Sequence, residues 1–245
     1  MFLRISHRGR DMKISTWNIG SIYKDFSENK AVMIEILKEY NPDIVCFQEF
    51  STDIRLEKDL LQSFDYPYHT VLPLSENHSI PGTKMGIAVL SRYELKNIQV
   101  HFLTNPNLTY LFNGKQETTH DKAFMSMDFA DNMHDYRLIT GHGIPFHRTS
   151  IKETDYLYIY QDLENWILSV TLPDRICVAA ADFNTDLLFG LCPLLMMQYQ
   201  SVFVDSTRPT GEQHDYILIH GGELSGRAIA TNFDHAMCFS ETLIR

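Results

Sequence analysis

Several short groups of polar residues follow apolar, strand-like runs of this sequence, and their side chains are of the types that bind metal ions and transfer protons. The groups are Trp17-Asn18, Gln48-Glu49, Gly141-His142, Asp182-Phe183-Asn184, and Asp215-Tyr216 with Asp234-His235. Each is a weak signal alone: a single Glu or His after a strand is more often an ordinary polar terminus, and Asp182 with Asn184 suits a helix cap or an Asx turn. As a set they are informative, because strand ends are where open sheets place their sites.

These residue types together suit phosphoryl transfer. Magnesium prefers a nearly octahedral set of oxygen ligands, supplied by one or two carboxylates together with water and phosphate. Phosphoryl transfer needs a metal to neutralise charge, a positioned nucleophile and a stabilised leaving oxygen. The inventory supplies all three functions and is therefore suited to metal-assisted phosphoryl transfer.

The elements that must position these residues alternate between strands and helices. Apolar and β-branched runs predict strands at 13–20, 43–50, 85–92, 122–130, 136–142, 175–184 and 213–220. Three helices are predicted. The first carries the apolar stripe that ends at Tyr40, the second covers about 52–64, and the third covers 151–170. The turn-rich segment 101–120 is interpreted as a meander or surface loop. Strands with helices inserted between them predict an α/β fold, a two-sheet sandwich flanked by helices.

Length and composition favour one folded domain. The chain has 245 residues, of which 44% are hydrophobic and 21% charged, which excludes disordered and low-complexity classes. Since no linker rich in Gly, Ser or Pro interrupts it, residues 12–245 are predicted to form a single domain. Residues 1–11 are interpreted as a flexible N-terminal extension or the product of an upstream start. No apolar run approaches the roughly 20 residues of a membrane span, and no signal-peptide pattern is present, so we expect a cytoplasmic location without membrane contact.

Charge and cysteine usage narrow the class further. The formal net charge of −10 argues against a protein that coats nucleic acid through diffuse positive charge, because such binding depends on Lys and Arg releasing counterions. It does not exclude an enzyme with a metal ion in a cleft. The four cysteines form no CxxC pair and are predicted to be reduced core thiols.

The order and spacing of the motifs resemble the endonuclease/exonuclease/phosphatase superfamily, also called the deoxyribonuclease I-like fold. The motifs are WN at 17–18, QE at 48–49, GIAVLSR at 86–92, ADFN at 181–184, DYI at 215–217 and DH at 234–235. The resemblance spans nearly the whole chain and implies a four-layer α/β sandwich that contains one catalytic domain. It also implies Mg²⁺ or Mn²⁺ as the cofactor.

The resemblance implies a role for each motif residue. Glu49 is similar to the family's principal metal-binding carboxylate, Asn18 to the amide that helps to hold the metal and the scissile phosphate, and Asp234 to a residue that reaches the metal or its water shell. The proposed catalytic residues are Asp182, which orients or activates the attacking water, Asn184 beside it, His235 on the phosphate with Asp215 as its partner, and His142, which protonates the leaving oxygen. Two departures are ADFN for the family's usual GDFN and FDH for its SDH.

A basic segment after His142 suggests how substrate would bind. In one interpretation His147, Arg148 and Lys152 contact flanking phosphates and Phe146 stacks a base. In the other, the segment is a loop that leads into a helix, with Arg148 solvated and Phe146 in the core. We expect a phosphodiesterase or nuclease that acts on DNA, with no stable protein partner; the sequence does not address the oligomeric state. A phosphomonoesterase on a small molecule, a 5′-tyrosyl-DNA phosphodiesterase and a non-catalytic binding module stay open as alternatives.

Overall fold

A computed structural model describes residues 12–20, 26–52, 58, 62–63, 66–77, 81–112, 114–203, 205–231 and 233–242. Its two main sheets have six strands each. In spatial order the first sheet holds β13 (Leu224–Ile229), β14 (Met237–Thr242), β1 (Lys13–Asn18), β2 (Ile44–Ser51), β4 (Lys84–Ser91) and β3 (Tyr68–Glu76). The second holds β11 (Gln200–Ser201), β12 (Asp215–His220), β10 (Ile176–Asp182), β9 (Asp135–Gly141), β8 (Ala123–Ala130) and β5 (Lys96–Phe102).

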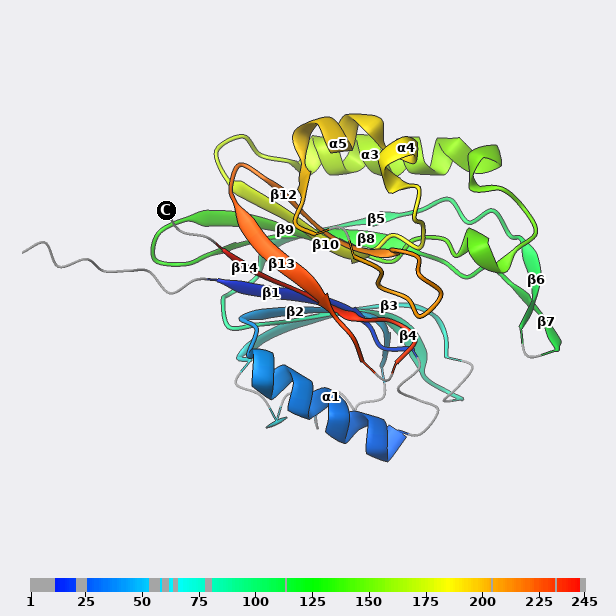
Figure 1. Cartoon of the computed structure of the whole chain (residues 1–245), viewed down its shortest axis with the longest axis horizontal. Helices are drawn as coiled ribbons and strands as arrows, with labels where there is room; N and C mark the ends of the chain where they lie inside the picture. Colours follow the sequence, from blue (N-terminus) through cyan, green and yellow to red (C-terminus); the bar gives the residue numbers. More distant parts are fainter. Residues whose placement is uncertain are drawn as a thin grey trace, which may run out of the picture.

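Helices cover the outer faces of both sheets (Figure 1). Helices α3 (Leu157–Val170), α4 (Leu188–Leu191) and α5 (Pro193–Gln198) lie over the second sheet, and α1 (Phe26–Tyr40) lies over the first. The result is a four-layer α/β sandwich, which confirms the predicted fold class. Among the described helices, none is both long and apolar enough to cross a membrane.

The side-chain alternation of the central strands explains why they are apolar on both faces. In β10, Cys177, Ala179 and Ala181 pack toward the helices over the second sheet. Val178 and Ala180 of the same strand pack toward the first sheet, since successive side chains point to opposite faces. A strand buried on both faces reads as a continuous apolar run rather than an alternating one. All four cysteines are buried and free, as predicted.

Strand pairing brings the polar ends of distant segments together. Parallel pairing of β1 with β2 places Asn18 beside Gln48, and antiparallel pairing of β10 with β12 places Asp182 opposite Asp215. A parallel bridge joins His142, just beyond β9, to Asp182. The predicted strand-end residues of each sheet therefore lie at one edge of that sheet.

Two predicted elements differ from the structure and two lie outside it. The helix predicted at 151–170 begins only at Leu157, and Glu153–Tyr156 forms a 3₁₀ turn, η3; no side chain caps either helix start. The apolar residues before Leu157 nevertheless contribute to the core, because Ile151 and Tyr156 pack against it. The turn-rich segment contains the end of β5 and a hairpin of β6 (Thr109–Phe112) and β7 (Lys115–Thr118). Residues 1–11 and most of 52–64 lie outside the described residues.

A buried charge cluster between β8 and β9 allows a stability prediction. Asp128 accepts hydrogen bonds from Arg137 Nε at 2.8 Å and from Asn97 Nδ2 at 2.8 Å, and Arg175 Nη1 lies 2.9 Å from its second oxygen. The side chains of Asp128 and Arg137 are each only 8% exposed. We expect Asp128→Ala to lower the free energy of unfolding by about 3 kcal/mol, because it leaves a buried guanidinium without its carboxylate.

Urea denaturation at pH 7 measures this effect. The matched control is Glu94→Ala, which removes a carboxylate that pairs with Lys96 while both side chains are more than half exposed. It is expected to cost less than about 1 kcal/mol, as exposed ion pairs do. Equal losses in the two variants would contradict the prediction.

Candidate active site

The strand ends of both sheets meet at a pocket of about 170 Å³. The predicted site residues that line it are Glu49, His142, Arg148, Asn184, Asp234 and His235. Asn18, Asp182 and Asp215 lie directly behind this lining, buried and hydrogen-bonded to it or to one another. Residues that are far apart in the chain therefore converge on one cavity.

Asn18 links the two sheets across the floor of the pocket. Its Nδ2 donates to Asp182 Oδ2 at 2.8 Å and lies 3.4 Å from Glu49 Oε1. Its Oδ1 accepts a hydrogen bond from the backbone N–H of Gly20 at 3.0 Å. One amide at the end of β1 thus fixes a carboxylate of β10 and approaches the carboxylate of β2.

Glu49 occupies a special backbone position. Its φ is +54°, and the pairing of β2 with β4 shifts register between Gln48 and Phe50. Such a bulge redirects one side chain out of the sheet, and here the redirected side chain, 21% exposed, lines the pocket. Any side chain larger than hydrogen at Gly20 would collide with this carboxylate, so the glycine leaves the space that Glu49 occupies.

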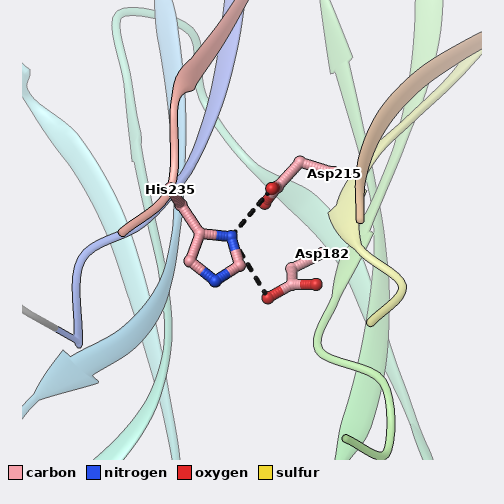
Figure 2. A group of neighbouring side chains, drawn as sticks. All are labelled: Asp182, Asp215 and His235. Carbon is pink, nitrogen blue, oxygen red and sulfur yellow. Dashed lines mark hydrogen bonds and ion pairs between the residues drawn. The ribbon is translucent and has the colours of Figure 1, made fainter. Parts of the chain in front are cut away.

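His235 is held between two aspartates (Figure 2). Its Nδ1 lies 2.8 Å from Asp215 Oδ2 and 4.0 Å from Asp182 Oδ2, and Trp17 Nε1 donates to its backbone carbonyl at 3.3 Å. Burial alone would lower the pKa of His235, but the charges of Asp215 and Asp182 outweigh burial and raise it to about 9. Burial and the charge of Asp215 together raise the pKa of Asp182.

Two sets of side chains could hold a cation. Donor atoms of Asp182, Asp215 and His235 all lie within 4.8 Å of one another. However, the raised pKa of His235 favours a proton on the ring, so a cation would have to displace that proton to bind the imidazole. The oxygen atoms around Glu49 and Asn18, with Asp234 on the same pocket wall, are the hard donors that Mg²⁺ or Mn²⁺ prefers.

Lys122, which the sequence analysis missed, lies against His142. Its Nζ is 2.9 Å from His142 Nδ1, while His142 Nε2 lies 3.5 Å from Asp182 Oδ2. Burial and the Lys122 charge lower the pKa of His142 far below its usual value, and burial lowers the pKa of Lys122 to about 8. Lys122 Nζ also lies 3.3 Å from His142 Nε2, so the neutral ring can accept from this ammonium at either nitrogen. A lysine directly before the buried strand β8 was the signal available in the sequence.

Arg208 is a second residue that the sequence analysis missed. It lies between β11 and β12, and its Nη1 is 3.2 Å from His235 Nε2. A guanidinium can only donate, and a protonated imidazole donates from both nitrogens. Arg208 lines a neighbouring pocket and not the catalytic one. With His235 protonated, both groups are donors, and an anionic oxygen that reached Nη1 and Nε2 could accept from both. No spacing rule links Arg208 to His235 in the sequence.

Comparison with known proteins supports the relationship that the motifs suggested. The sequence model of the Endonuclease/Exonuclease/phosphatase family matches residues 15–236. The chain belongs to this family. Members of the family are generally divalent-metal-dependent hydrolases, and it includes both nucleases and phosphatases. The search of curated protein sequences finds no match.

Solved structures of this family share the fold at low sequence identity. The catalytic domain of human nocturnin with bound sulfate superposes with a TM-score of 0.71 at 16% identity, over 94% of this chain and 93% of that one. A family protein from Leptotrichia buccalis gives 0.70 at 15% identity, over 95% and 100%. Truncated TDP2 from Caenorhabditis elegans gives 0.64 at 13% identity, over 96% and 98%.

The segment that follows His142 divides between pocket, surface and core. Arg148 lines the pocket, but His147 is exposed and packs its ring 4.7 Å from that of His214. Lys152 is exposed at the start of η3 and lies outside the pocket lining. Phe146, in the 3₁₀ turn η2 (Phe146–Arg148), is 1% exposed and packs on Tyr156. The core interpretation of Phe146 is therefore correct, and a base cannot stack on it.

Asn184 forms the predicted Asx turn and also lines the pocket. Its backbone N–H donates to Asp182 Oδ1 at 2.8 Å, which is the predicted Asx turn, and its φ is +57°. Its Nδ2 donates to the Gly143 carbonyl at 3.0 Å. The turn itself is what brings Asn184 to the pocket wall.

Proposed function

We propose that this protein is a divalent-metal-dependent phosphodiesterase that cleaves DNA by in-line attack of water. The observation that carries the proposal is convergence. Glu49 from the first sheet and Asn184 from the second line one pocket with His235, and Asn18 connects Glu49 to Asp182 behind it. A protein that only binds a partner has no physical need for this combination of carboxylates, amides and a charged imidazole.

The metal ion would be held by Glu49 and Asn18, with Asp234 reaching it directly or through water. Mg²⁺ and Mn²⁺ both fit a set of carboxylate and amide oxygens. When bound, the ion supplies neutralisation of the negative charge that develops on the phosphate.

The remaining groups move protons and bind the phosphate. Asp182, whose pKa is raised, orients the attacking water and accepts its proton. His235, held protonated by Asp215, donates with Arg208 to the non-bridging oxygens. His142 stabilises the leaving oxygen by donating a hydrogen bond, and Lys122, whose Nζ contacts both ring nitrogens, holds the imidazole in place.

Turnover assays with several esters test the proposal. Wild type and His235→Ala would be incubated with Mg²⁺, Mn²⁺ or EDTA on plasmid DNA, single-stranded DNA, RNA, a 5′-tyrosyl oligonucleotide and small phosphomonoesters. We expect cleavage of DNA by wild type with metal, and none with EDTA or in the variant. DNA left intact under all metal conditions would overturn the proposal.

A phosphomonoesterase that acts on a small molecule is the second candidate. The net charge of −10 and the carboxylates of Glu117 and Asp121 on the pocket wall disfavour a long polyanion near the site. Phosphate release from a small ester, with every polynucleotide left intact, would select this candidate.

Arg208 provides a prediction on substrate binding. We expect Arg208→Ala to raise KM roughly 10- to 100-fold, the scale of one lost charge-assisted hydrogen bond to phosphate. Arg208→Lys should recover part of the loss because it keeps the charge. The control is Arg227→Ala, which should leave KM unchanged. Arg227 belongs to β13, and its guanidinium lies over the ring of Tyr40 at the end of α1. An unchanged KM in Arg208→Ala would exclude phosphate contact by this side chain.

A further inference from the structure

A second, more open pocket of about 500 Å³ adjoins the catalytic one. The residues that line it are Thr109, Tyr110, Leu111, Gln116, Arg148, Thr149 and Ser150, from the β6–β7 hairpin and the end of η2. Tyr110 and Arg148 line both pockets and so form the wall between them. The Arg148 guanidinium hydrogen-bonds the Tyr110 side chain, and the Glu49 charge acts on the same tyrosine. A group in the second pocket therefore contacts two side chains that also line the catalytic pocket.

The chemistry of the second pocket differs from that of the first. The catalytic pocket is lined by four carboxylates, Glu49, Glu117, Asp121 and Asp234. Of the described residues that line the second pocket, none carries a carboxylate, and the lining offers three hydroxyls, an amide, a phenol ring and one guanidinium. Neutral donors and acceptors beside an aromatic ring suit a flat, neutral group that itself carries hydroxyls and amides. The single cation, Arg148, stands where that group would join a phosphate.

The two pockets together match a phosphorylated molecule with one large organic substituent. We propose that the second pocket binds a nucleoside esterified to the scissile phosphate, with its base against Tyr110 and its polar edge at Gln116. The inference rests on the proposed phosphoesterase function and specifies the substituent that the site selects. Tyr110 and Gln116 are then specificity-determining residues, and Arg148 positions the phosphate between the pockets.

A pair of matched esters tests the inference. Thymidine 5′-(4-nitrophenyl phosphate) and methyl 4-nitrophenyl phosphate release the same 4-nitrophenolate and differ only in the second substituent. We expect wild type with Mn²⁺ to prefer the thymidine ester, and Gln116→Ala to reduce the ratio of the two kcat/KM values, mainly through KM. Tyr110→Ala should reduce it roughly tenfold, the scale of one lost base–aromatic stack. Tyr110→Phe, which keeps the ring, should retain most of the preference.

Two controls define the specificity of the effect. Thr118→Ala lies on the same strand as Gln116 but lines neither pocket, and should leave the ratio unchanged. Glycerol 4-nitrophenyl phosphate offers hydroxyls without a flat base. If it replaced the thymidine ester at equal efficiency, a polyol and not a nucleoside would be the ligand, and the inference would be wrong.

A binding measurement separates this inference from the proposed function. Calorimetry with thymidine 5′-monophosphate and with methyl phosphate needs no turnover. Tighter binding of the nucleotide by wild type, lost in Gln116→Ala, would support the nucleoside pocket even if neither ester were hydrolysed, a result that would refute the phosphodiesterase instead. Equal hydrolysis of both esters by wild type, with equal binding of both ligands, would overturn the nucleoside pocket and keep the phosphodiesterase.

Discussion

Replacement of Glu49 by Gln is expected to lower kcat/KM on the order of 10³-fold, because it removes the charged donor of the proposed metal site and with it the charge neutralisation at the phosphate. The fold should tolerate the change. Gln has the same shape as Glu, and the Glu49 carboxylate lies near those of Asp182 and Asp234, so the loss of one negative charge relieves repulsion. Turnover assays and thermal unfolding in a Mn²⁺ titration measure both effects.

The unfolding experiment provides an independent reading of metal binding. In wild type, the midpoint temperature should rise with Mn²⁺ concentration, because a ligand that binds only the folded state stabilises it by mass action. In Glu49→Gln this rise should shrink or vanish. A variant that keeps both the Mn²⁺-dependent rise and the turnover of wild type would show that Glu49 is not a metal ligand. Glu117→Gln, which removes another carboxylate of the same pocket outside the proposed donor set, is the matched control.

Replacement of Asp215 by Asn is expected to lower kcat on the order of 10³- to 10⁴-fold, as does the loss of a carboxylate that orients a catalytic histidine in other hydrolases. Asp215 Oδ2 accepts from His235 Nδ1 at 2.8 Å, and an amide in its place can present a donor to that nitrogen. The ring would then lose both its orientation and the charge that holds it protonated. Steady-state kinetics on any ester that wild type cleaves measures the loss.

The same substitution should change how stability depends on pH. The pKa of His235 in the folded protein is about 9, above its usual 6.5. Its protonation therefore stabilises the fold fully below about pH 6.5. This contribution is lost as the pH rises through 9. Removal of the Asp215 charge lowers the folded pKa, so Asp215→Asn should lose the decline of the unfolding temperature between these values. A decline equal to that of wild type would show that Asp215 does not set the pKa of His235.

Strands in the middle of a sheet, and the site residues at their ends, were easier to predict from the sequence than strands and site residues near loops. The central strands could be predicted because burial on both faces leaves continuous apolar runs, such as Ile176–Asp182, whose polar ends stand out. The strands β3, β5 and β13 were missed because none of their residues is buried, so they carry no continuous apolar run. The strand β14 was missed although residues 237–240 are buried, because its apolar run is only three residues long before Ser240.

The missed site residues have a common physical reason. Lys122 and Arg208 reach His142 and His235 through tertiary packing between segments 20 and 27 positions apart, and no local pattern encodes such contacts. Lys152, in contrast, has the right charge at a nearby position, but the start of η3 places it at the surface. Position along the chain predicted that Lys152 lies near the site. Which basic side chain faces the pocket depends on the direction of the side chain, which the sequence pattern does not give.

The hydrogen bond from Asn18 to Asp182 crosses the seam between the two halves of the sandwich, as does the contact of His235 with Asp215. Neither half contains a working centre alone. A shift of about 1 Å between the halves can cost a hundredfold in rate while leaving every strand intact. The turnover rate should therefore be sensitive to the relative position of the two sheets. Conservative substitutions of the methionines and valines between the sheets should lower this rate before circular dichroism detects a loss of secondary structure.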